Sequence, residues 1–103
     1  METIRERIAR LLEETEHPLS AEEIAGIIGL DPHRDVRVVY EHIRHVSKTV
    51  FRRSGGRLQV FMVPPRCREC GYVFRLETPR KPSKCPRCGS QRIEPPRFII
   101  MKR

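Results

Sequence analysis

The sequence has no tryptophan, and aromatic residues make up only 6% of its 103 residues. So few rings provide no aromatic-rich stacking motif that would support RNA recognition, although the basic charge would suit RNA as well as DNA. No apolar run approaches the length of about 20 residues that a membrane-spanning helix needs, and no signal-peptide pattern opens the chain. We therefore expect a cytoplasmic protein that does not contact a membrane.

Motifs that carry out catalysis are also missing. The sequence contains no phosphate-binding glycine loop, no G-x-S-x-G element and no Ser, His and Asp in the order of a triad. Glu13, Glu14 and Glu16 fall at a solvated helix end and do not suggest an acid/base pair. His42 and His45 are three residues apart, but no further metal ligand stands at a suitable spacing. We therefore predict no catalytic residues and no enzyme activity.

All four cysteines lie in two C-x-x-C-G knuckles, which the fourteen residues from Gly71 to Lys84 separate. Two thiolates on one tight turn can bind one edge of a tetrahedral ion, and a second turn supplies the opposite edge at about 2.3 Å. The spacing matches that of zinc sites. Four sulfur ligands leave no position for water or substrate, so the metal has a structural role. We predict one Zn²⁺ per chain, bound by Cys67, Cys70, Cys85 and Cys88.

Iron is the alternative metal. The two knuckles, Cys67-x-x-Cys70-Gly71-Tyr72 and Cys85-Pro86-x-Cys88-Gly89, resemble those of rubredoxin. A rubredoxin-like iron redox protein is therefore one alternative function. The lack of tryptophan and an inter-knuckle loop much shorter than that of rubredoxin favour zinc. Disulfides or free thiols are the remaining interpretation, but nothing in the sequence suggests secretion.

The net charge of +8 is distributed unevenly along the chain. Residues 1–33 hold three Arg against eight acids and carry −5, whereas residues 34–63 carry +5 and residues 64–103 carry +8. A protein with an acidic and a basic end has an orientation, and its basic part is expected to face an anion such as nucleic acid. A solvated charged surface is the alternative interpretation.

The N-terminal third predicts two helices. Thr3-x-x-Glu6 and Ser20-x-x-Glu23 are capping boxes, each followed by apolar residues with helical spacing. We therefore expect helices over residues 4–14 and 21–28. Gly29 stands where a left-handed residue would end the second helix.

A third helix is expected over about residues 36–53, because valine and isoleucine recur there at spacings of three and four. Asp31 or Asp35 is expected to cap it. A shorter helix that ends near Ser47, followed by a β-hairpin around Gly55-Gly56, is the alternative.

The C-terminal half predicts a strand on each side of the cysteine-containing segment. Residues 57–63 and 97–102 are apolar and strand-like, and a Pro-Pro pair stands on the inner side of each. We expect these strands to pair antiparallel, with the cysteine ribbon at the tip of their hairpin. Within the ribbon we expect a strand over residues 72–77 and a brief pairing over residues 90–93.

Three helices followed by a two-stranded hairpin is the element order of a winged helix-turn-helix. Over its whole length the chain resembles an archaeal family of predicted regulators in which this fold is joined to a rubredoxin-like zinc ribbon. The match is carried by residues 38–46 (VVYEHIRHV), 64–74, 82–88 and 94–98. The expected fold class is α+β: a winged helix-turn-helix with a four-cysteine zinc ribbon inserted as or at the wing. Residues 1–63, completed by residues 97–103, would form the first domain and residues 64–96 the ribbon.

The third helix is the one expected to contact DNA. In a helix-turn-helix the second helix of the motif enters the major groove, where Arg37 and Arg44 can read guanine or bind phosphate. A solvated helix with Arg37–Glu41 and Glu41–His45 pairs is the alternative, and the long turn before this helix weakens the case for groove reading. The predicted nucleic-acid contacts are Arg34, Arg37, Arg44, Lys48, Arg80 and Lys81.

These observations favour a DNA-binding transcriptional regulator with a structural zinc ribbon, whose partner is double-stranded DNA. The first alternative is a protein-interaction module of the transcription machinery, which docks through the ribbon on RNA polymerase or a basal transcription factor. Duplex-reading proteins of this kind are often dimers, so a homodimer is compatible with either function.

Overall fold

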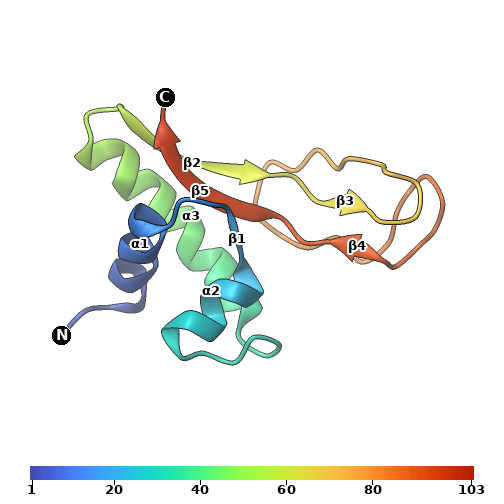
Figure 1. Cartoon of the computed structure of the whole chain (residues 1–103), viewed down its shortest axis with the longest axis horizontal. Helices are drawn as coiled ribbons and strands as arrows, with labels where there is room; N and C mark the ends of the chain where they lie inside the picture. Colours follow the sequence, from blue (N-terminus) through green and yellow to red (C-terminus); the bar gives the residue numbers. More distant parts are fainter.

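The computed structural model describes residues 1–103 and contains three helices and five strands. The helices are α1 (Ile4–Glu14), α2 (Ala21–Ile28) and α3 (Val36–Arg53). The strands are β1 (Leu19–Ser20), β2 (Leu58–Val63), β3 (Arg66–Cys67), β4 (Ile93–Glu94) and β5 (Arg97–Lys102). Figure 1 shows the helices gathered at one end of the molecule, with the cysteine ribbon projecting at the other. The predicted α+β class is confirmed.

Helices α1 and α2 begin at the predicted capping boxes. The Thr3 hydroxyl accepts the backbone N–H of Glu6, and the Glu6 carboxylate accepts the backbone N–H of Thr3. Ser20 and Glu23 make the same reciprocal pair at the start of α2. Each box satisfies two of the backbone N–H groups that a helix start leaves without a partner. Helix α2 ends at Gly29, whose φ of 86° is left-handed as expected.

Helix α3 is 18 residues long and reaches Arg53, so the longer prediction is confirmed and the shorter helix is wrong. Its start differs from the prediction, because the side chain of Asp35 makes no capping hydrogen bond. The Asp31 carboxylate instead accepts the backbone N–H groups of His33 and Arg34, and the Asp35 carboxylate accepts that of Asp31. Both aspartates therefore organise the turn before the helix, where backbone donors lie within reach of short side chains.

The main core lies where the three helices meet the sheet. Ile8, Ile24, Val39 and Ile43 come from the three helices and are almost completely buried. Phe98 of β5 is also fully buried, and its ring packs edge-to-face on Tyr40 with centroids 6.2 Å apart. The inward side chains of β2 and β5 pack on the same cluster: Leu58, Val60, Met62 and Ile100. None of the helices combines the length and the apolar character needed to cross a bilayer.

The larger sheet has the strand order β1–β5–β2 and is antiparallel throughout. The predicted pairing of the two long strands is confirmed, with Leu58 opposite Lys102 and Val63 opposite Arg97. The sequence did not predict β1, which places Leu19 opposite Phe98. Two residues directly before a helix carry no strand periodicity, so β1 exists only because β5 offers it a free edge.

The ribbon has less regular structure than the sequence predicts. Strands β3 and β4 pair Arg66 with Glu94 and Cys67 with Ile93, which places the second pairing later than residues 90–93. The strand expected over residues 72–77 is wrong, because only Val73 forms an isolated bridge there. The two backbone hydrogen bonds of this bridge run from the Phe74 N–H to the Pro65 carbonyl at 3.0 Å and from the Cys67 N–H to the Tyr72 carbonyl at 2.9 Å. Antiparallel pairing around the first knuckle is therefore limited to this one bridge and does not extend along residues 72–77.

Truncating Phe98 to alanine should destabilise the protein by about 3–5 kcal/mol, because a fully buried ring leaves a cavity where helices and sheet meet. Met101→Ala on the same strand is the matched control. Met101 is 51% exposed on the other face of the sheet, so its truncation should stay within about 0.5 kcal/mol. Denaturant unfolding of both variants measures the difference. Equal losses of unfolding free energy in the two variants would contradict the central position of Phe98 in the core.

Candidate metal centre and basic surface

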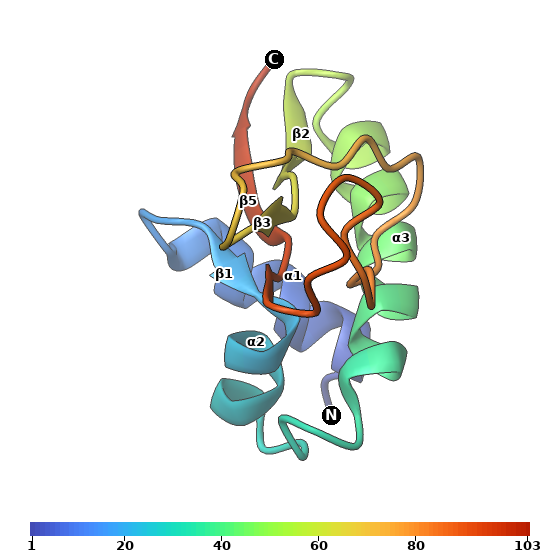
Figure 2. The same cartoon turned by 90° about the vertical axis from the view of Figure 1, so that its right-hand side faces the viewer.

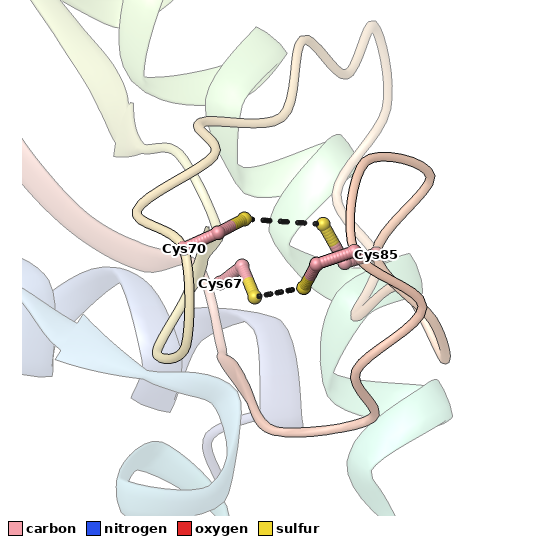
Figure 3. A group of neighbouring side chains, drawn as sticks. Cys67, Cys70 and Cys85 are labelled. Carbon is pink, nitrogen blue, oxygen red and sulfur yellow. Dashed lines mark hydrogen bonds between the residues drawn. The ribbon is translucent and has the colours of Figure 1, made fainter.

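The four cysteine sulfurs lie together at the far end of the ribbon. Their Sγ atoms all lie within 4.8 Å of one another. The Cys67–Cys88 distance is 3.5 Å and the Cys70–Cys85 distance is 3.6 Å (Figure 3). Four sulfurs placed 2.3 Å from one ion would lie about 3.8 Å apart. The cluster therefore has the dimensions of a single tetrahedral ion. None of the cysteines is in a disulfide.

Each pair of cysteines comes from a knuckle with the same hydrogen-bonding pattern. In the first knuckle the Gly71 N–H bonds to the Cys67 carbonyl at 2.9 Å, and in the second the Gly89 N–H bonds to the Cys85 carbonyl at 2.9 Å. Gly71 and Gly89 have φ of 78° and 76°, so both turns need a residue that accepts a left-handed backbone. The backbone N–H of Arg87 points at the sulfur of Cys85 at 3.4 Å. The local sequence of each knuckle is therefore enough to place its two cysteine sulfurs on one turn.

Backbone N–H groups and burial shift the pKa values of three of the four thiols, and the neighbouring thiols add smaller contributions. The backbone N–H of Cys70 lowers the pKa of Cys67 to about 7, although burial opposes this. Burial raises the pKa of Cys85, but backbone N–H groups of the second knuckle outweigh it and lower that pKa. The backbone N–H of Ser90 lowers the pKa of Cys88, yet burial and the neighbouring thiols outweigh it and raise that pKa to about 12. The cluster therefore resists carrying several negative charges without a cation, and a divalent ion would remove that conflict.

A small apolar cluster surrounds the metal ligands. Cys67 and Cys85 are buried with Phe74 and Ile93, and the Phe74 ring packs edge-to-face on Tyr72 with centroids 5.0 Å apart. Four thiolates in a closed shell fit a structural tetrahedral ion and leave no open position for substrate. The same donor set also suits iron, so this geometry does not distinguish the two metals.

Four of the six predicted nucleic-acid contacts line a single cleft between α3 and the ribbon. Arg37 and Arg44 come from α3, and Arg80 and Lys81 come from the ribbon segment 78–81, which runs beside this helix (Figure 2). The cleft has a volume of about 420 Å³. The other two predicted nucleic-acid contacts lie outside this cleft. Lys48 lines a neighbouring cleft that also includes Arg44, whereas Arg34 lies before α3 and lines neither.

The cations of this cleft have no ion-pair partners. The protein contains three ion pairs, Arg10–Glu2, Arg34–Asp35 and Arg92–Glu69. The alternative with Arg37–Glu41 and Glu41–His45 pairs is not found, because neither pair comes within 4.0 Å. Glu41 nevertheless lines the cleft and is its single acidic residue. The lining therefore has an excess of three positive charges that no other side chain neutralises.

Thr78 and Pro79 line this cleft together with Tyr40, a juxtaposition that no sequence pattern predicted. It joins segments more than 30 residues apart, so no local pattern could have revealed it. His42, for which the sequence offered no metal-binding partner beyond His45, accepts a hydrogen bond from the Arg5 guanidinium at 3.1 Å. It therefore ties α3 to α1.

Comparisons with known proteins agree with this architecture. A family described as PF0610-like, N-terminal, matches residues 3–59, and the PF0610 rubredoxin-like zinc beta-ribbon domain matches residues 64–103. The solution NMR structure of protein PF0610 from Pyrococcus furiosus is similar, with a TM-score of 0.73 and 36% identity over 97% of this chain and 90% of that chain. No curated protein sequence matches the chain. The chain therefore belongs to the PF0610-like family, with an N-terminal domain followed by a rubredoxin-like zinc ribbon.

Proposed function

We propose that this protein is a non-enzymatic, DNA-binding transcriptional regulator whose ribbon is folded by one zinc ion. The observation that carries the proposal is the set of unpaired cations that α3 and the ribbon present together. Phosphate contacts from Arg and Lys supply most of the affinity of proteins for DNA. Zinc on Cys67, Cys70, Cys85 and Cys88 would hold the ribbon, and hence half of these cations, in place.

The order of the elements supports a winged helix-turn-helix. Helices α2 and α3 follow one another across the turn of residues 29–35, and β2 and β5 form the hairpin after α3. In this proposal α3 is the DNA-contacting helix and the ribbon is an insertion at the tip of the wing. Residues 1–63 with 97–103 would then form one domain and residues 64–96 the other.

The position of the ribbon favours phosphate contact over base reading. The major groove of B-DNA is about 12 Å wide, and an α-helix with its side chains is about 10–12 Å across. The groove therefore admits one helix and no second chain beside it. Because segment 78–81 shares a cleft with Arg37 and Arg44, those side chains can meet phosphates at the rim of a groove without α3 entering it. Such binding depends weakly on sequence and strongly on salt.

A protein-interaction module of the transcription machinery is the second candidate. The face of the β2–β5 pair away from the helices exposes Phe61, Val63 and Met101, and the ribbon exposes Val73. Exposed apolar residues such as those on this face of the β2–β5 pair are typical of protein contacts. In such a module the basic cleft would bind either an acidic protein or DNA.

Elemental analysis of the metal-replete protein should find one zinc per chain. Cys85→Ser should lose the metal and disorder the ribbon while α1–α3 keep their structure, because the ribbon has only a small core of its own and structural zinc contributes folding free energy of about 10 kcal/mol or more in small domains. Nuclear magnetic resonance spectra of the variant measure this, with Ser83→Ala on the exposed ribbon surface as the control. Red protein with visible absorption that reduction bleaches would instead identify iron and the redox alternative.

Fluorescence anisotropy with a random duplex should show saturable, salt-sensitive binding. Replacing both Arg44 and Arg80 by glutamine should weaken it and reduce the log–log salt slope by about two, roughly one for each phosphate that the variant no longer neutralises. Arg10→Gln on the acidic half is the control, since Arg10 already pairs with Glu2. A flat titration of the wild-type protein would contradict the DNA-binding proposal and favour the protein-interaction module.

A further inference from the structure

The basic cleft continues into a second cleft of different chemistry. The second cleft has a volume of about 340 Å³ and lies farther along α3, between this helix, β2 and the ribbon. Arg44, Thr78 and Pro79 line both clefts. The two therefore form one groove with a basic half and an apolar half.

The basic half suits phosphate groups. Arg37, Arg44, Arg80 and Lys81 converge on it from two sides, and none has a carboxylate within 4.0 Å. Guanidinium groups bind phosphate through two parallel hydrogen bonds, and a lysine adds a compact charge. Thr78 adds a hydroxyl that can donate to a phosphate oxygen.

The apolar half suits a flat, weakly polar group. Val60 and Met62 contribute partly exposed apolar side chains to its lining, and the buried Phe98 lies beneath them. Ser47, Lys48 and Glu77 add donors and an acceptor around them. Small-molecule sites combine in this way an apolar surface with a few polar groups that fix orientation. An aromatic base matches both the apolar lining and the polar groups.

We propose that this groove binds a nucleoside phosphate, with the phosphates in the basic half and the base in the apolar half. The volumes of about 420 Å³ and 340 Å³ lie in the range of about 300–1,000 Å³ found for small-molecule sites. A duplex cannot lie between α3 and segment 78–81, so this site differs from rim contacts with DNA. It goes beyond the regulator function and does not require it. The nucleotide site and the proposed DNA contacts share cations, so a bound nucleotide would compete with DNA phosphates.

The experiment uses the full-length, metal-replete chain labelled with ¹³C at its methionine methyl groups. The chain has three methionines. Met62 lines the apolar half, whereas Met101 is exposed on the opposite face of the sheet. Titration with ATP should shift the Met62 methyl resonance through the ring current of the base, with saturation, and leave that of Met101 unchanged. Inorganic pyrophosphate should bind more weakly and leave Met62 nearly unmoved.

Variants locate the phosphates by calorimetry with ATP. Arg44→Gln should weaken binding about tenfold, since charge-assisted hydrogen bonds to phosphate are removed. Arg52→Gln removes the same charge from the same helix outside the groove and should change affinity less than about twofold. Glu41→Gln should tighten binding, because it removes the acidic group beside the phosphates. All three side chains are exposed, so the folded state and zinc content should be unchanged.

Several results would overturn this inference. Equal losses of affinity for Arg44→Gln and Arg52→Gln would show that only net charge matters. A stationary Met62 resonance at saturating ATP, or pyrophosphate binding as tight as ATP, would remove the base-binding half. Absence of saturable ATP binding in a chain that still binds the duplex would reject this inference and leave the regulator proposal standing. Saturable ATP binding in a chain that does not bind the duplex would support this inference and reject the regulator proposal.

Discussion

The antiparallel pairing of β2 with β5 is the constraint on which the rest of the structure depends. The chain leaves β2 at Val63, runs through the whole ribbon and returns at Arg97, directly opposite. Paired strands lie about 4.8 Å apart, so both ends of the ribbon are held next to each other on the edge of the helical body. The buried Pro65 and Pro96 lie just beyond this junction. The ribbon is therefore anchored at both ends and can hold segment 78–81 beside α3.

The two parts of the molecule are stabilised by different interactions. The helical part buries a cluster of 13 residues that includes Phe98, contributed by the strand that returns from the ribbon. The apolar cluster of the ribbon contains only four buried residues, two of which are cysteines. So few apolar side chains cannot by themselves offset the conformational entropy of ordering some 30 residues. A metal ion is the interaction that makes such a module stable. The groove beside α3 thus depends on metal chemistry at the other end of the ribbon.

The charge distribution gives the folded protein a polarity that its composition only suggests. The acidic N-terminal third forms α1 and α2, whereas α3 and the ribbon carry the basic residues. In the basic half of the groove, four cations outnumber a single carboxylate and have no ion-pair partner, so their mutual repulsion costs folding free energy. An anion that binds there relieves this repulsion. The proposed DNA contacts and the proposed nucleotide site both use this same feature.

The sequence by itself determined what depends on neighbouring residues. The capping boxes at Thr3 and Ser20, the length of α3 and the two knuckles follow from side chains within a few positions of each other, so local patterns predicted them correctly. The pairing of β2 with β5 was also predictable, because two apolar strands flank one insertion. Local reasoning was wrong for the expected strand over residues 72–77, where only Val73 pairs, in a single bridge with Arg66.

Only the tertiary structure decided how these parts meet. Strand β1 has no pattern of its own and exists because β5 has a free edge. The groove joins residues of α3 to segment 78–81. No pattern in the sequence of this segment predicts a contact with α3. The ion pairs of the alternative interpretation of α3 did not form, although their spacing allowed them. Spacing along one helix fixes which side chains can meet, but long-range packing decides which charges are left without a partner and therefore which surface can bind an anion.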